Sequence, residues 1–306
     1  MFIRIITIIL LLQVSLSAIT QKIDYSKVIL GVSSPTLSPQ LKRYLQSGLG
    51  GVILIGKSWK YTNETQHFIK AIKTLSPTLL VCIDQEGGSV TRLKSPHAPL
   101  PSAQTIGRLH SVYTAHQLGM QNGLHLKSLG IDINFAPVLD VITATHNTVI
   151  GSRSFGTDPD HVAQLGIAYM KGLKDSGILP VIKHFPGHGD TIKDSHYELP
   201  INHHSMRYLE NISIKPFYHA IQYNAPAVML AHILYPTKDP IYPASLSQSW
   251  IQYLRNDLGF TGLIITDDLS MKAISNHYST RQAIDIALTA GVDYVIISNL
   301  RKLNVN

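Results

Sequence analysis

The chain has little cysteine: Cys82 is the one cysteine among 306 residues. A single thiol cannot form an intramolecular disulfide, and it cannot build a cysteine-based metal site. Cys82 lies inside the apolar run TLLVCID at 78–84. A lone cysteine in such a run is most often a small buried hydrophobic residue. We therefore predict that Cys82 is packed in a strand core.

Acidic side chains are also scarce. The chain has 19 Asp and Glu against 26 Lys and Arg, which gives a formal net charge of +7 and an isoelectric point of about 9.3. This balance favours anionic partners. The basic residues are scattered, however, and form neither the basic stripe nor a reader motif typical of nucleic-acid-binding proteins. No nucleic-acid partner is expected, and the anionic polymers of a cell envelope fit the charge equally well.

Long apolar runs are absent after the first residues, MFIRIITIILLLQVSLSA. There, Arg4 precedes the apolar stretch and the small residues Ser15, Ser17 and Ala18 follow it, as in a secretory signal peptide. The stretch is short for a membrane span. We assign residues 1–20 to a signal peptide, or to an N-terminal anchor if it is not cleaved. We therefore expect export to the periplasm or cell envelope; a cytoplasmic location is the alternative if the leader is not functional.

Short apolar runs alternate with amphipathic stretches through the rest of the chain. Most runs are nearly continuous in Val, Ile and Leu, as expected for parallel strands buried on both faces. Their ranges are 27–33, 50–56, 78–84, 131–137, 178–184, 227–233, 262–268 and 292–298. Eight such units without a linker predict an α/β fold, a single (β/α)8 TIM barrel. A doubly wound open sheet is the alternative, but no glycine-rich nucleotide turn follows the first run.

The helical stretches show the expected end signals. Ser38 is a candidate N-cap for the first of them, and Gly291 is placed to end the last one before the final strand. Only SNLRKLNVN follows that strand, too few residues for a normal eighth helix. We therefore expect the last helix to be missing or truncated. Its absence predicts exposed apolar surface at the seam of strands eight and one, or cover by a partner or by the N-terminal segment.

Polar side chains stand where the predicted strands end. In a barrel of this kind the active site lies at the carboxyl ends of the strands, so these residues are expected to face one site. They are Asp84, Asn134, Lys183, His184, His232, Asp267, Asp268, Ser298 and Asn299. Because Asp267 and Asp268 are adjacent in an extended segment, only one of them can face the pocket directly. The other is expected to cap the next helix or orient a neighbour.

The segment KHFPGHGDTIKDSH at 183–196 is the densest group of proton-transferring side chains in the chain. PGHG breaks regular structure, so a long loop is expected after His184, and loops of this length are usually functional. In the triplet Asp194-Ser195-His196 the carboxylate can bond one imidazole nitrogen and leave the other free to exchange a proton. This spacing predicts a proton-transfer pair.

A metal site built by His184, His188 and His196 is the competing interpretation. Phe-Pro-Gly separates the first two histidines, so they cannot share a helical face as the ligands of an HExxH motif do. We expect no metal and no cofactor. The sequence assigns no role to His188.

Five ordered segments resemble one known family. They are DQEGGSVTRL (84–93), NFAPVLDV (134–141), GSRSFGTDP (151–159), KHFPGHGDTIKDSH (183–196) and ITDDLSM (265–271). Together they resemble glycoside hydrolase family 3, and within it the single-barrel bacterial β-N-acetylhexosaminidases that act on peptidoglycan fragments. The resemblance runs from about residue 27 to about 299, and it implies that 21–306 is a catalytic barrel domain of this family.

The resemblance implies a retaining exo-β-N-acetylglucosaminidase that forms a covalent glycosyl-enzyme on terminal β-linked N-acetylglucosamine. By motif, Asp267 is the nucleophile in preference to Asp268, His196 is the general acid/base, and Asp194 is its partner. The resemblance also implies a set of substrate-binding residues: Asp84, Arg92, Arg153, Lys183, His184 and Met271. We expect no second α/β sandwich domain after the barrel, and we therefore expect these side chains to come from one barrel or a neighbouring protomer.

Other functions on the same fold stay open. One group keeps the fold and changes the reaction: a β-glucosidase, a β-xylosidase or a glycoside phosphorylase. Another is a glycan-binding protein without catalysis, which the short barrel suggests. The intact Asp194–His196 pair and the TDD segment argue against the second.

Overall fold

The computed structural model describes residues 23–60, 62–93, 99–144, 147–191, 194–299 and 303. The predicted leader, residues 1–20, lies outside the described residues, as does any cleavage site within it. Within the described ranges, no helix combines the length and the apolar character that a membrane span requires.

A parallel sheet forms the centre of the molecule. Its strands are β1 (Val28–Val32), β2 (Gly51–Leu54), β3 (Leu80–Ile83), β6 (Ile133–Asn134), β7 (Leu179–Pro180), β8 (Ile182–Phe185), β9 (Ala227–Leu230), β10 (Leu263–Asp268) and β11 (Tyr294–Ile297). The strand order is β7-β6-β3-β2-β1-β11-β10-β9-β8. Its two ends, β7 and β8, are parts of one stretch interrupted only at Val181, so the sheet closes on itself. The predicted eight-stranded barrel is confirmed.

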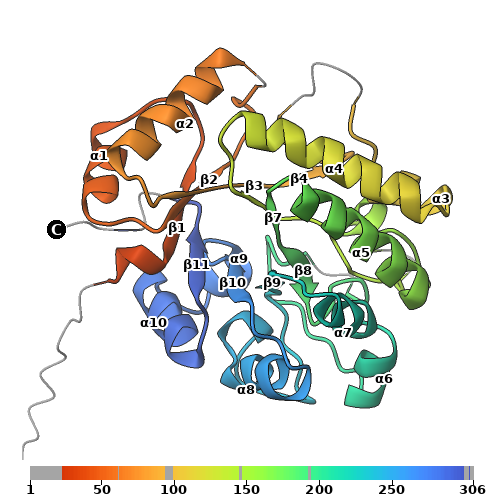
Figure 1. Cartoon of the computed structure of the whole chain (residues 1–306). Helices are drawn as coiled ribbons and strands as arrows, with labels where there is room; N and C mark the ends of the chain where they lie inside the picture. Colours follow the sequence, from red (N-terminus) through yellow and green to blue (C-terminus); the bar gives the residue numbers. More distant parts are fainter. Residues whose placement is uncertain are drawn as a thin grey trace, which may run out of the picture.

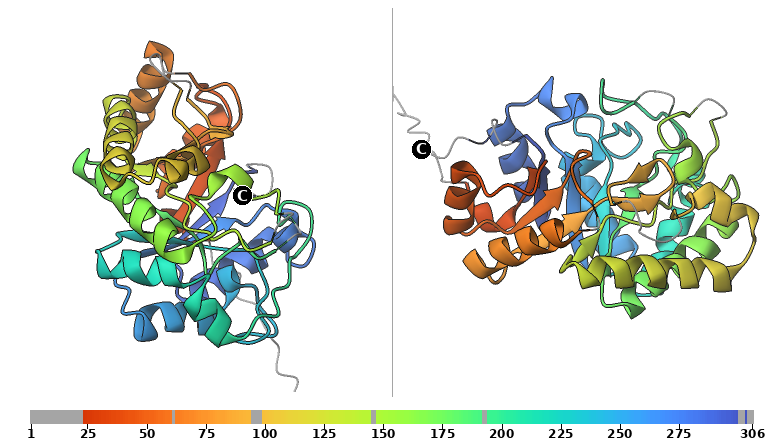
Figure 2. Two further views of the ribbon diagram at one scale, coloured as in Figure 1. Left: turned by 90° about the vertical axis from the view of Figure 1, so that its right-hand side faces the viewer. Right: turned by 90° about the horizontal axis from the view of Figure 1, so that it is seen from above.

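Helices surround the strands, as Figure 1 shows and the turned views of Figure 2 repeat. The main ones are α1 (Pro39–Gln46), α2 (Asn63–Leu75), α4 (Val112–Ser128), α5 (Pro159–Asp175), α7 (Lys215–Gln222), α8 (Gln248–Gln252) and α10 (Thr280–Ala290). Shorter helices are α3 (Ala103–Arg108), α6 (Met206–Asn211) and α9 (Lys272–Ser275), with single turns η1 (Tyr25–Lys27), η2 (Gly151–Arg153) and η3 (Ala244–Leu246) and the π-helical η4 (Tyr253–Asp257). A hairpin of β4 (Gln85–Gly87) and β5 (Val90–Thr91) follows β3.

Local sequence signals explain where helices begin and end. The Ser38 hydroxyl accepts a hydrogen bond from the Leu41 N–H at 3.1 Å, which satisfies one free donor at the start of α1. At the end of α10, Gly291 adopts a φ of 110°, a left-handed conformation that a side chain would disfavour. Both predictions of helix ends are confirmed.

Alternate strand residues face two separate cores. Inward-pointing side chains fill the barrel, and they include Cys82, which is fully buried as predicted. Outward-pointing side chains pack under the helices in a larger cluster. Because both faces of the strands are buried, the near-continuous apolar runs in the sequence are what this architecture requires.

At the seam of β1 and β11 the sequence predicted exposed apolar surface, or cover by a partner or by the N-terminal segment, and the described residues do not show the exposed surface. The outward-facing Val28, Val295 and Ile297 are fully buried. Leu303 is buried in the same cluster, and its carbonyl oxygen accepts a hydrogen bond from the Tyr44 hydroxyl of α1. Of the residues after β11 the structure describes 298, 299 and 303, and the chain's own Leu303 contributes to the cover.

Candidate active site

A cavity of about 310 Å³ opens at the carboxyl ends of the barrel strands. Eight of the nine site residues predicted from the sequence line it: Asp84, Arg92, Arg153, Lys183, His184, His196, Asp267 and Met271. The ninth, Asp194, does not line the cavity but binds His196. Residues from β3, β8, β10 and the loops that follow them are therefore brought to one place, as the barrel predicts.

One wall of the cavity is a cluster of carboxylates and cations. Lys183 Nζ lies 2.7 Å from Asp84 Oδ1 and 2.6 Å from Glu86 Oε1. Arg153 binds Glu86 through two hydrogen bonds of 2.8 Å, and Arg92 Nη2 lies 4.0 Å from Asp84 Oδ2. Such a wall offers both acceptors and donors to the hydroxyl groups of a polar ligand.

The ionisation of this cluster is set by its own members. Burial alone would raise the pKa of Glu86, but the charges of Arg153 and Lys183 beside it hold the pKa well below its usual range. Burial would likewise lower the pKa of Lys183, and Asp84 and Glu86 raise it instead. Glu86 and Lys183 are therefore both charged at neutral pH, each because of its oppositely charged neighbours.

His184 is held by a buried carboxylate on its far side. Its Nδ1 lies 2.7 Å from Asp140 Oδ2, and its Nε2 points to Arg153 Nη2 at 3.3 Å. Asp140 is fully buried and follows β6 on a segment that runs beside β8, where Val138 pairs with Lys183. This contact with Asp140 fixes the ring that faces the cavity.

The two adjacent aspartates of β10 have different surroundings. Asp268 Oδ1 accepts hydrogen bonds from the N–H groups of Ser270 and Ser298, both at 2.9 Å. Asp267 Oδ1 accepts one from the Asp268 N–H at 2.7 Å, and the described residues give its Oδ2 no hydrogen-bond partner. Asp268 thus caps a turn and orients the neighbouring strand end, although both residues border the cavity.

Asp267 is ionised over the whole physiological range. Burial opposes its charge, but the neighbouring His232 and His184, the Asp268 N–H and Lys183 outweigh burial and lower the pKa of Asp267 to about 2. His232 is fully buried below it, between Ser245 Oγ at 2.7 Å and the Asp268 carbonyl oxygen at 2.9 Å. A carboxylate with a free oxygen in a cavity can act as a nucleophile.

The Asp194–His196 pair stands on the long loop after β8. Asp194 Oδ1 lies 2.7 Å from His196 Nδ1 and also accepts the His196 N–H at 2.9 Å. Burial raises the pKa of Asp194, but the hydrogen bonds from the His196 N–H and ring lower it overall. The carboxylate therefore stays charged and fixes the imidazole so that Nε2 is available for proton exchange.

The PGHG segment, where the chain leaves the barrel, packs closely on its neighbours at its two glycines. A Cβ on Gly189 would lie 1.7 Å from the Val141 carbonyl oxygen, so only glycine fits there. Gly187 has a φ of 135° and packs on Ser213. These contacts bring His188 back under the loop, where it is buried and borders the cavity.

The three histidines of the loop segment hold separate partners rather than a common centre. His184 binds Asp140, His188 binds Thr191 and Ser195, and His196 binds Asp194. Over the residues that the structure covers, no group of three or more His, Cys, Asp and Glu is placed to hold a metal ion.

Sequence reasoning missed three members of the site: Glu86, Asp140 and Ser195. Glu86 stands two residues after Asp84, in β4, a hairpin strand that the sequence analysis did not separate from the strand before it. Asp140 lies in NFAPVLDV, beyond the predicted end of its strand. Ser195 stands between two catalytic candidates, and its own side chain gives no sign of a role. The sequence feature that could have indicated all three residues is that each lies in one of the five motif segments.

Comparison with known proteins decides the family. A model described as the glycosyl hydrolase family 3 N-terminal domain matches residues 33–305, nearly the whole chain. The chain belongs to glycoside hydrolase family 3. Among its relatives, a protein named Beta-hexosaminidase from Nitrosomonas eutropha is 37% identical over 281 residues, which are 89% of this chain and 80% of that protein.

Solved family 3 structures share the fold. NagZ from Neisseria gonorrhoeae, determined in complex with N-trifluoroacetyl-D-glucosamine, is 34% identical with a TM-score of 0.82, covering 89% of this chain and 81% of that one. A family 3 β-N-acetylglucosaminidase from Paenibacillus sp. is 33% identical with a TM-score of 0.87. That match covers 91% of this chain but 55% of the larger Paenibacillus protein.

Proposed function

We propose that the protein is a retaining exo-β-N-acetylglucosaminidase that removes terminal, non-reducing β-linked N-acetylglucosamine. The observation that carries the proposal is a single cavity bordered by an ionised Asp267 with one free oxygen and by His196 with its carboxylate partner. Family 3 membership and relatives named Beta-hexosaminidase support the sugar and the reaction.

In the first step Asp267 Oδ2 attacks the anomeric carbon as the bond from that carbon to the aglycone oxygen breaks. Protonated His196 gives its Nε2 proton to the departing oxygen, and Asp194 stabilises the imidazolium through Nδ1. The products of this step are the free aglycone and a glycosyl ester on Asp267, and His196 is left neutral.

In the second step neutral His196 takes a proton from water, and the water oxygen attacks the anomeric carbon and releases Asp267. The sugar keeps its β configuration because the carbon is inverted twice. A histidine suits this role because it is uncharged when it acts as a base and does not repel an anionic nucleophile. The same property would permit attack by phosphate.

The charged wall supplies the proposed sugar contacts. The Asp84 carboxylate can accept hydrogen bonds from hydroxyl groups of the sugar, and the Lys183 ammonium can donate to them. Arg92, Arg153 and His184 also line this part of the cavity, and Met271 lines it with an apolar side chain. A cavity of about 310 Å³ is at the small end of ligand sites and suits one terminal sugar. This size supports exo action over internal cleavage.

We propose peptidoglycan fragments as the natural substrate and the periplasm or cell envelope as the location. The basic net charge of +7 supports an anionic envelope polymer, and the signal-like residues at the N-terminus support export. Mass spectrometry of the protein from cell fractions tests the location. A full-length chain in the cytosol would overturn it.

The activity is tested with 4-nitrophenyl β-N-acetylglucosaminide and the variants Asp267→Ala and His196→Ala. We expect release of nitrophenol by the wild type, none by Asp267→Ala, and a glycosyl adduct on Asp267 after a 5-fluoro N-acetylglucosamine probe. Azide should restore the second step of His196→Ala. Faster reaction with the matching glucoside or xyloside, or dependence on phosphate, would replace the proposal with a different family 3 activity, and binding without turnover would refute catalysis.

A further inference from the structure

Ser195 is a buried residue between the partly exposed Asp194 and the exposed His196. The side chains of Asp194 and His196 are 33% and 60% exposed, whereas Ser195 is only 2% exposed. Its hydroxyl lies 3.2 Å from His188 Nε2, and its carbonyl oxygen accepts the Ala273 N–H at 3.2 Å. The proton-transfer pair is thus attached to the protein body at the residue between its members.

Both ring nitrogens of His188 have hydroxyl partners. Thr191 Oγ1 lies 2.9 Å from Nδ1, and Ser195 Oγ lies 3.2 Å from Nε2. In either neutral tautomer one ring nitrogen donates and the other accepts, and a hydroxyl group can do both, so the contact between Nε2 and Ser195 is a hydrogen bond in both tautomers. Burial and the nearby His184 lower the pKa of His188 to about 4, although Asp140 opposes this, so the ring is neutral at pH 7.

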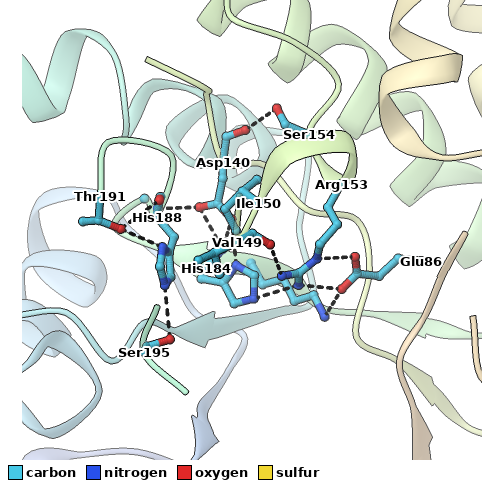
Figure 3. A network of polar contacts seen from close by, with 12 residues as sticks. Glu86, Asp140, Val149, Ile150, Arg153, Ser154, His184, His188, Thr191 and Ser195 are labelled. Atoms are coloured by element: carbon cyan, nitrogen blue, oxygen red, sulfur yellow. Dashed lines mark hydrogen bonds and ion pairs between the residues drawn. The ribbon is translucent and has the colours of Figure 1, made fainter. Parts of the chain in front are cut away.

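Asp140 joins His188 to the sugar side of the cavity. Its Oδ1 accepts the His188 N–H at 2.7 Å, and its Oδ2 lies 2.7 Å from His184 Nδ1. Figure 3 shows this arrangement: Asp140 stands between the two histidines, Arg153 and Glu86 lie beyond His184, and Thr191 and Ser195 lie beyond His188. One buried carboxylate therefore fixes both the ring at the charged wall and the ring that holds Ser195.

We propose that His188 is a positioning residue that sets the place of the Asp194–His196 pair through its hydrogen bond to Ser195. It does not touch the reacting atoms in this role. His188 also binds Asp140, which binds His184. It therefore connects the position of the proton-transfer pair to the position of the charged wall of the sugar site. The inference rests on the proposed function, because it assigns to His188 the placement of the proposed acid/base.

Two substitutions of His188 separate its two hydrogen bonds. Glutamine reaches about as far as Nε2 and can still accept the Ser195 hydroxyl, whereas asparagine reaches only the position of Nδ1 and leaves Ser195 without its partner. Ser195→Ala removes the same bond from the other side. Ser213→Ala is the matched control, because its hydroxyl donates a hydrogen bond to Asp190 Oδ2 of the same loop at 2.7 Å and not to His188 or Ser195.

The readout is kcat/KM on aryl β-N-acetylglucosaminides that differ in leaving group. A poor leaving group needs the proton from His196, and a dinitrophenyl group does not, so misplacement of His196 lowers the first rate and largely spares the second. We expect His188→Asn and Ser195→Ala to lose about 10- to 100-fold on the poor leaving group. A purely structural defect would lower all substrates by the same factor.

Further outcomes decide the inference. We expect His188→Gln to regain most of the rate on the poor leaving group, Ser213→Ala to keep the wild-type leaving-group dependence, and the double variant His188→Asn/Ser195→Ala to be no worse than either single one. Equal losses on all substrates, additive effects, or a matching change in Ser213→Ala would overturn it. If His196→Ala loses the same factor on the poor leaving group and on the dinitrophenyl group, the proposed function fails and the inference fails with it. If His196→Ala loses more on the poor leaving group and His188→Asn does not, the inference alone fails.

Discussion

The guanidinium of Arg153 binds the carboxylate of Glu86 through two parallel hydrogen bonds, each 2.8 Å long. Glu86 also accepts a hydrogen bond from Lys183 Nζ at 2.6 Å, so one buried carboxylate lies between the buried Lys183 and the partly buried Arg153. Without it, Arg153 and Lys183 would repel each other in a region from which water is largely excluded. Glu86 thereby keeps in place two side chains that we assign to the sugar.

Glu86→Gln is expected to destabilise the fold by about 3 kcal/mol, because it removes the carboxylate that binds Arg153 and one of the two carboxylates that bind Lys183. It should also raise KM through displacement of Lys183. The matched control is Asp285→Asn, which removes an exposed ion pair with Arg281 within α10 and should change the free energy of unfolding by less than about 0.5 kcal/mol. Urea unfolding at pH 7 measures both values. Two equally small changes would show that the Glu86 pairing contributes little.

The aspartates of β10 should differ sharply when each is changed to asparagine. Asp268→Asn keeps an oxygen that can accept the N–H groups of Ser270 and Ser298, so most activity should remain. Asp267→Asn removes the attacking carboxylate and should lower kcat by about 10³-fold or more. Steady-state kinetics on the nitrophenyl substrate decides between them, and the reverse pattern would identify Asp268 as the nucleophile.

The barrel could be predicted because its strands are buried on both faces and therefore appear as continuous apolar runs. Each of the eight runs contains a strand of the barrel, and the strand in the fifth run ends at Phe185, one residue beyond the predicted range. Of the nine polar residues predicted at the strand ends, six line the cavity: Asp84, Lys183, His184, Asp267, Asp268 and Ser298. Asn134 and His232 are instead fully buried, and Asn299 does not line the cavity. The part that Leu303 takes in covering the seam of β1 and β11 could not be predicted, because its hydrogen bond with Tyr44 joins residues 259 positions apart.

The support of the site could not be predicted in the same way. Asp140 reaches His184 and His188 only because the chain after β6 continues alongside β8, with the Leu139 N–H bonded to the Lys183 carbonyl oxygen at 2.7 Å. That register is a tertiary fact with no local signal. Glu86 could be placed in the site only with knowledge of the turn into the β4–β5 hairpin. Ser195 could be placed there only with knowledge that it is buried between two more exposed residues.

Cys82 should be inert in the folded protein. It lies inside the barrel with no exposed surface, and burial together with nearby Asp132 and Asp84 raises the pKa of its thiol well above the usual value. We expect no reaction with Ellman's reagent under native conditions and reaction of one thiol per chain in denaturant. Rapid labelling of the native enzyme without loss of structure would contradict the burial.

Stability should begin to fall below about pH 6.5, before most carboxylates titrate. Buried His188 has a pKa of about 4 in the folded state, with His184 and Arg153 opposing its charge and Asp140 favouring it, whereas an unfolded histidine titrates near 6.5. Between these values the unfolded state binds the extra proton, so stability is complete above 6.5 and is lost as pH falls towards 4. The loss is about 3 kcal/mol at most.

His188→Gln should remove most of this decline, because glutamine binds no proton in either state. The remainder would come from His232, whose pKa burial also lowers. The depressed pKa values of Asp140 and Asp267 produce a separate loss that begins below about pH 4 and should persist in the variant. Urea unfolding of both proteins at half-unit steps from pH 7 to 3.5 measures the difference, and parallel curves between pH 6.5 and 4 would show that His188 is not the group responsible.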